Sequence, residues 1–129
     1  MNLLLDTHVA LWAVADSPRL SAAAKSLIAT PENKVSVSAA SLWEIAIKHA
    51  NGGGRTMPVS ADEAHDKFSL AGFGLLSIAA AHALALETLP PIHKDPFDRI
   101  LAAQARAEGM TLLTADVVLA KYPGDVRKV

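Results

Sequence analysis

The sequence predicts a three-layer α/β/α fold with a central parallel sheet of four to five strands. Short apolar runs alternate with longer segments of helical periodicity, which is typical of strands and helices in alternation. Each run is apolar at nearly every position, as in strands that are covered on both faces. The chain has 129 residues, 51% of them hydrophobic and 19% charged, so we expect one domain over residues 1–129 and exclude a disordered chain.

The first half of the chain predicts two strands and three helices. Leu3–Leu5 is a short buried strand that ends at Asp6, and a helix follows it up to Ser17-Pro18. Ser21 can cap a second helix through Ile28, because proline at position 31 disfavours helical backbone just before it. Residues 34–38 alternate with period two, as a strand does, and a helix over 39–50 ends at the glycine-rich loop 51–54.

The second half continues the alternation. Ser60 begins a helix with an acid three residues later, as in a capping box, and Asp95-Pro96 and Gly109 are typical of the start and end of another. The other expected elements are a strand over 73–78, a helix over 80–89 stopped by two prolines, a buried strand over 110–114, a short helix over 116–121 and an edge strand over 126–129.

Composition limits the chemistry that is available. The chain has no cysteine, which excludes disulfides, thiolate metal sites and cysteine nucleophiles, so any metal must bind oxygen or imidazole. The formal net charge of −1 is not that of a protein that wraps nucleic acid by charge alone. Residues 70–86 are too short and too polar for a membrane span, and the first residues lack a basic secretion signal. We expect a cytoplasmic protein that does not enter a membrane.

Four acids stand where a parallel sheet gathers its ligands, beyond the carboxyl ends of the strands. Asp6 follows the first strand, Asp116 follows the strand over 110–114, Asp98 lies in the first turn of its helix, and Glu44 lies one to two turns into the helix after the second strand. Each also has a structural interpretation: Asp6 and Asp116 could be helix caps, and Asp98 could be the first-turn acid of a capping box with Asp95. Glu44 could pair with Lys48 on a solvated face. Together they favour a site, since Glu44 lies in a largely apolar helix.

Carboxylates a few ångström apart raise one another's pKa and cannot all stay ionised at neutral pH without a cation. A purely oxygen-based ligand set selects hard divalent ions, so Mg²⁺ or Mn²⁺ is expected ahead of zinc. Such an ion activates water and stabilises charge on phosphate oxygens, which is the chemistry of phosphodiester hydrolysis. The four acids therefore predict a metal-dependent hydrolase of nucleic acid.

Four blocks of the sequence are notable for their order and spacing: Leu3–His8 (LLLDTH), Ser41–Ile45 (SLWEI), Asp95–Ala105 (DPFDRILAAQA) and Leu113–Asp116 (LTAD). In these blocks the chain resembles the PIN domain family, most closely the VapC-type toxin ribonucleases. The resemblance covers essentially the whole chain. It implies a PIN-like α/β/α fold, a Mg²⁺- or Mn²⁺-dependent endoribonuclease that cuts an RNA substrate, a VapB-type antitoxin partner that inhibits it, and a homodimer.

The resemblance also implies roles for particular residues. The acidic quartet that holds the metal and supports catalysis matches Asp6, Glu44, Asp98 and Asp116, while Asp95 is left out because the family's acid directly precedes the Arg-Ile-Leu-Ala-Ala run. The supporting hydroxyls match Thr7 and Thr114, and the possible phosphate contacts are Lys48 and Arg99. No histidine is assigned a role. Trp12 and Trp43 are expected to pack in the core or in a dimer interface.

Two other classes of protein were weighed against this hypothesis. A receiver-like signalling module would need an acid pair after the first strand and a lysine after the last, and the sequence has neither. A non-catalytic, PIN-shaped module that binds RNA or a protein without cutting is the main alternative. The intact quartet argues against it.

Overall fold

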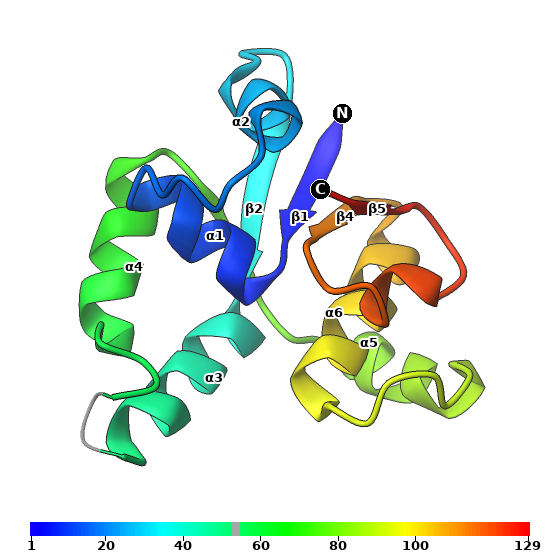
Figure 1. Ribbon diagram of the computed structural model, residues 1–129. Coiled ribbons are helices and arrows are strands. Elements are labelled where there is room, and N and C mark those ends of the chain that lie inside the picture. The colour runs from blue at the N-terminus through cyan, green and yellow to red at the C-terminus, as the bar shows by residue number, and fades with distance from the viewer. Residues whose placement is uncertain (53–54) are drawn as a thin grey trace.

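Five parallel strands form one sheet in the order β3-β2-β1-β4-β5, which confirms the predicted α/β architecture. The computed structural model describes residues 1–52 and 55–129 (Figure 1). Gly53 and Gly54, part of the predicted loop 51–54, lie outside the described residues. The strands are β1 Asn2–Leu5, β2 Lys34–Ser38, β3 Gly74–Leu76, β4 Thr111–Thr114 and β5 Val126–Lys128.

Helices connect the strands and cover both faces of the sheet (Figure 1). They are α1 Thr7–Val14, α2 Ala22–Ala29, α3 Ala39–Ala50, α4 Ala61–Leu70, α5 Ala80–Ala85 and α6 Pro96–Glu108, with short 3₁₀ turns η1 Leu86–Thr88 and η2 Leu119–Lys121. Several begin as the sequence predicts, because the Ser21 and Ser60 hydroxyls accept the first free amides of α2 and α4. Gly109 ends α6 in left-handed backbone, where a side chain would be strained, and the chain turns back into β4.

The central strand explains the continuous apolar run at the start of the sequence. Leu3 and Leu5 point to one face of the sheet and pack with residues of α1, α2, α3 and α4, including Val9 and Ile45. Leu4 points to the opposite face and packs against α6 through Leu101. All three leucines are fully buried, because side chains alternate along a strand and both faces are covered.

Some elements are shorter than predicted. The strand expected over 73–78 spans only Gly74–Leu76, and the helix expected over 116–121 is reduced to the 3₁₀ turn η2. Pairing with β2 limits β3 at the edge of the sheet, and it joins only three residues of each strand. In residues 1–52 and 55–129, none of the helices has the length and hydropathy needed to cross a membrane.

Candidate active site

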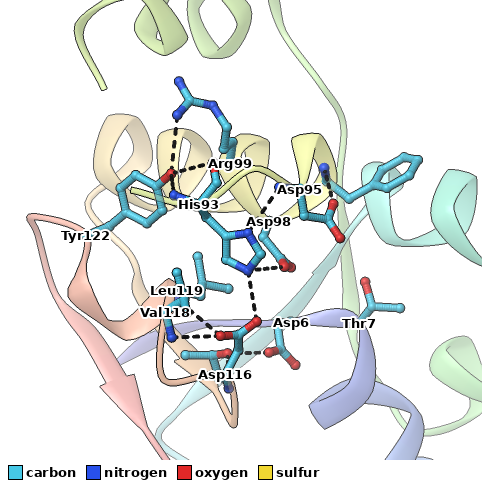
Figure 2. A network of polar contacts seen from close by, with 12 residues as sticks. Asp6, Thr7, His93, Asp95, Asp98, Arg99, Asp116, Val118, Leu119 and Tyr122 are labelled. Carbon is cyan, nitrogen blue, oxygen red and sulfur yellow. Dashed lines mark hydrogen bonds and ion pairs between the residues drawn. The ribbon is translucent and has the colours of Figure 1, made fainter. Parts of the chain in front are cut away.

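The four predicted acids gather at the carboxyl end of the sheet. Asp6 directly follows β1, Asp116 follows β4, and Glu44 lies on α3, which starts where β2 ends. Asp98 enters from the first turn of α6. Figure 2 shows Asp6, Asp98 and Asp116 turned toward one small region, with α1 and α6 on either side.

Asp6 caps α1, and Asp116 accepts backbone amides in the turn that leads into η2. Asp6 Oδ1 accepts the Val9 amide at 2.8 Å, which caps α1, and Asp116 Oδ1 accepts the Val118 amide at 2.7 Å. The second oxygen of each carboxylate faces inward: Asp6 Oδ2 meets Thr114, and Asp116 Oδ2 meets His93. The capping interpretation and the site interpretation are therefore compatible, because one oxygen serves each purpose.

Two threonines tie the acids together. Thr114 Oγ1 donates to Asp6 Oδ2 at 2.5 Å and accepts the Asp116 amide at 2.9 Å, so it spans both acids. On the other side Thr7 Oγ1 donates to Glu44 Oε1 at 2.6 Å and lies 2.9 Å from Ser41 Oγ. Both hydroxyls hold a carboxylate in place, which is the arrangement expected around a metal-binding acid.

Glu44 does not lie on a solvated face, since only 3% of its side chain is exposed. Lys48, one turn along α3, pairs with Glu44 Oε2 at 2.5 Å, so the i,i+4 pair exists but is largely enclosed. Burial acts to lower the pKa of Lys48, but the hydrogen bond with Glu44 and the charges of Glu44, Asp95 and Asp98 outweigh it and raise that pKa. Lys48 thus stands as a fixed positive charge at the border of the acids.

The pKa of Asp98 is raised from 3.8 to about 7. Burial is the largest cause, and the charge of Asp95 comes next. The charges of Glu44 and Asp6 act in the same direction, while His93 lowers the pKa. Burial likewise raises the pKa of Asp6, against hydrogen bonds from Thr114 and Val9 that lower it. Acids from three segments of the chain are thus electrostatically coupled at Asp98.

His93 is the site residue that sequence reasoning missed. Its Nε2 lies 2.9 Å from Asp116 Oδ2 and 3.1 Å from Asp98 Oδ2, so the ring bridges the two carboxylates (Figure 2). Burial acts to raise the pKa of Asp116, but the hydrogen bond with His93 and those from the Val118 and Leu119 amides lower it. A search of the sequence for two histidines at metal-ligand spacing does not detect His93. Its place five residues before Asp98, in the segment that leads into α6, is the available signal.

Two other residues of the predicted third block have structural tasks. The Arg99 guanidinium points away from the acids (Figure 2) and donates to the Pro90 carbonyl at 3.2 Å and to Tyr122 Oη at 3.3 Å. In this structure the donors of Arg99 bind groups of the fold, and a phosphate contact by Arg99 stays a prediction. Asp95 Oδ1 accepts the Phe97 amide at 2.9 Å and caps α6, and its absence from the quartet stays a prediction.

Neither tryptophan is fully buried. Trp43 is 58% exposed and meets the Phe97 ring edge-on at 5.1 Å between centroids, so it does not belong to the core. Trp12 is partly buried, packs against the core and lines a groove beside α1.

The donor set at this edge fits a divalent cation. One ligand atom each of His93, Asp98 and Asp116 lie within 4.8 Å of one another. Asp6 and Glu44, both nearly fully buried, add carboxylates that are electrostatically coupled to Asp98. Buried carboxylates of this kind need a compensating positive charge, and hard oxygen ligands suit Mg²⁺ or Mn²⁺.

Comparison with known proteins identifies the fold and the family. No curated protein matches the chain. The fold is similar to VapBC2 from Rickettsia felis bound to a DNA fragment from its promoter (TM-score 0.72, 16% identity, covering 100% of this chain and 99% of that one). It is also similar to a toxin-antitoxin complex from Klebsiella pneumoniae (TM-score 0.62, 22% identity, covering 98% of this chain and 99% of that one). A third similar structure is VapBC-1 from nontypeable Haemophilus influenzae (TM-score 0.64, 16% identity, covering 99% of this chain and 98% of that one). The PIN domain family model matches residues 3–125. The chain belongs to the PIN domain family.

Proposed function

We propose that this protein is a VapC-like toxin, a metal-dependent endoribonuclease that hydrolyses RNA phosphodiester bonds. Mg²⁺ or Mn²⁺ is its cofactor, held by the carboxylates of Asp6, Glu44, Asp98 and Asp116. The family assignment and the toxin-antitoxin complexes among its structural neighbours support the proposal.

One observation carries the proposal. Two side chains join three of the acids: Thr114 bonds Asp6 and the Asp116 amide, and His93 bridges Asp116 and Asp98. The fourth acid, Glu44, is bonded by Thr7, the residue that follows Asp6. Helix caps alone would leave each acid with its own helix and no common neighbour. A set of buried carboxylates held by fixed donors is instead typical of a preorganised cation site.

The chain's own residues would then divide the work. A bound divalent ion supplies an activated water and stabilises the negative charge of the phosphate. Thr7 and Thr114 fix the orientation of Glu44 and Asp6. Lys48 balances part of the negative charge at the border of the site and is a candidate for a phosphate contact, since its side chain is 36% exposed.

An antitoxin partner has a surface to bind beside the site. A groove of about 400 Å³ runs between α1 and the segment before α4, with Trp12 and Met57 in its wall and Arg19 and Lys67 at its border. His8, two residues after Asp6, lines the same groove, and its charge lowers the pKa of Asp6. We propose that a VapB-type antitoxin segment lies there and presents an Arg or Lys to the carboxylates, as a cation that blocks the metal.

A homodimer is proposed through a second, separate surface. Trp43 and Phe97, together with Ile78 and Leu86, line an apolar hollow of about 380 Å³ between α3, α5 and α6. Leu84, 66% exposed, lies on α5 beside it. Exposed apolar patches of this kind favour protein association, and a dimer would cover Trp43 as the sequence suggests.

Incubation of the purified protein with labelled single-stranded RNA tests the enzymatic proposal. We expect cleavage with Mg²⁺ or Mn²⁺, none in chelator, and a loss of orders of magnitude in Asp6→Asn. Asp66→Asn, exposed on α4, is the matched control and should cleave as the wild type does. A folded, metal-bound wild type that cuts no RNA would favour the non-catalytic module that binds RNA or protein.

A further inference from the structure

The His93 ring is held in one orientation by groups outside the acidic site. The Asp95 backbone amide donates to its Nδ1 at 3.0 Å, and the His93 amide donates to Tyr122 Oη at 2.8 Å. Tyr122 is buried and also accepts from Arg99, whose guanidinium is anchored on the Pro90 carbonyl. The ring is therefore positioned by the fold and not only by the acids that it touches.

The contact with Asp95 decides which ring nitrogen carries hydrogen. A backbone amide can only donate, so Nδ1 must offer its lone pair, and the neutral ring carries its hydrogen on Nε2. This N–H lies between two acceptors, Asp116 Oδ2 and Asp98 Oδ2. One donor thus holds two carboxylate oxygens together.

This tautomer is the opposite of the one that a metal ligand needs. A histidine that binds a metal through Nε2 must have a lone pair there, and it usually donates its other ring N–H to an oxygen. Here Nδ1 accepts the Asp95 amide. Ligation through Nε2 would place the hydrogen on Nδ1, and that N–H would then face the N–H of Asp95. The geometry favours His93 as a donor to the acids over His93 as a member of the metal's ligand set.

We propose that His93 is a positioning residue that pins Asp98 and Asp116 in the metal-free site and competes with the divalent ion for the same two oxygens. The inference rests on the proposed function, because it takes these acids to be metal ligands. The imidazole N–H lies between the two carboxylates, donates to both and keeps them aligned. A metal enters by displacing that N–H, so His93 lowers metal affinity while it preserves the arrangement of the site.

Two variants separate this role from ligation. His93→Asn retains a short acceptor for the Asp95 amide but has no group that reaches the Nε2 position. His93→Gln retains an amide N–H near that position, where it can still donate to the acids. The hydrogen bond with Asp116 raises the pKa of His93, so Mn²⁺ and Mg²⁺ affinities are measured by calorimetry at a pH well above that raised pKa, where the ring is neutral. Circular dichroism and thermal melts in chelator confirm that each variant is folded.

We expect His93→Asn to bind both ions about tenfold more tightly, because the ion no longer displaces a hydrogen bond to charged groups, and His93→Gln to stay near the wild type. In chelator, His93→Asn should melt at a lower temperature, since the two carboxylates lose their shared donor. Equal or weaker binding by His93→Asn overturns the inference, and a loss greatest for Mn²⁺ would assign ligation instead. A wild type that binds neither ion would overturn the proposed function itself.

Discussion

Replacement of Asp98 by asparagine should stabilise the metal-free protein at neutral and alkaline pH. The folded state raises the pKa of Asp98 from 3.8 to about 7, so ionised Asp98 is held there at a free-energy cost. Three pKa units correspond to about 4 kcal/mol at most, and relaxation of a side chain that is 18% exposed reduces the expected gain to about 2 kcal/mol. Asparagine removes the charge and keeps an oxygen that can accept the His93 N–H.

Thermal melts in chelator at several pH values measure this effect. The native state binds the Asp98 proton more tightly than the unfolded chain does, so the wild type loses this part of its stability as the pH rises from about 4 through about 7. The advantage of Asp98→Asn should grow over that interval and then level off, at roughly 5–10 °C in Tm. Asp66→Asn, exposed on α4, controls for the loss of one negative charge.

Added metal should make the wild type more stable than Asp98→Asn, which reverses the order of stability expected in chelator. At a hundredfold excess over Kd the wild type should gain about 2.7 kcal/mol, and the variant should gain much less because a ligand charge is gone. An Asp98→Asn protein that is less stable than the wild type in chelator at pH values above 7 would refute the reasoning. That result would indicate that Asp98 stabilises the start of α6 and is not a strained acid of a metal site.

Five further outcomes are expected. Asp6→Asn should still cap α1, because asparagine caps as well as aspartate, yet metal binding by calorimetry and RNA cleavage should both be lost; an active variant would remove Asp6 from the site. Thr114→Val should lower metal affinity or RNA cleavage by about 10–100-fold, since Asp6 loses a fixed donor; wild-type affinity and cleavage would contradict this task. Asp95→Asn should lower the cleavage rate only slightly in the same assay, and a loss greater than that of Asp98→Asn would show that Asp95, and not Asp98, is the acid of the site. Mg²⁺ affinity by calorimetry should fall as the pH drops below about 7, where protons compete for Asp98; a flat profile would contradict that pKa. Trp43→Glu should convert a dimer to a monomer in light scattering with cleavage in dilute solution retained, and an unchanged dimer would place the interface elsewhere.

The fold could be predicted from local signals. The Leu3–Leu5 run, the Ser21 and Ser60 caps and the Gly109 terminus each act through their own neighbours, and the structure retains all of them. The acids followed from the same reasoning, because a parallel sheet brings its carboxyl ends to one edge whatever the details of packing. The edge strand β3 is shorter than its apolar sequence suggested, since its length depends on pairing with β2.

What could not be predicted depends on contacts between distant segments. His93 contacts Asp98, five residues away, and Asp116, 23 residues away, and the sequence near His93 does not signal the second contact. Arg99 follows an acid of the site, but its guanidinium binds the Pro90 and Leu86 carbonyls, which would otherwise lack these donors. Trp43 is large and apolar, and only the arrangement of α3 and α6 leaves it exposed against Phe97.

The bond between Thr114 and Asp6 joins residues that are 108 positions apart, and β1 lies between β2 and β4 in the sheet. A chain emerging from the ribosome therefore presents Asp6 and Glu44 long before their counterparts exist. Asp6 stays without the Thr114 hydroxyl until β4 has been made, and Asp98 and Asp116 arrive together with their shared histidine. No nascent fragment that ends before Asp116 contains the full set of acids. The complete site can therefore form only after nearly the whole chain has been synthesised.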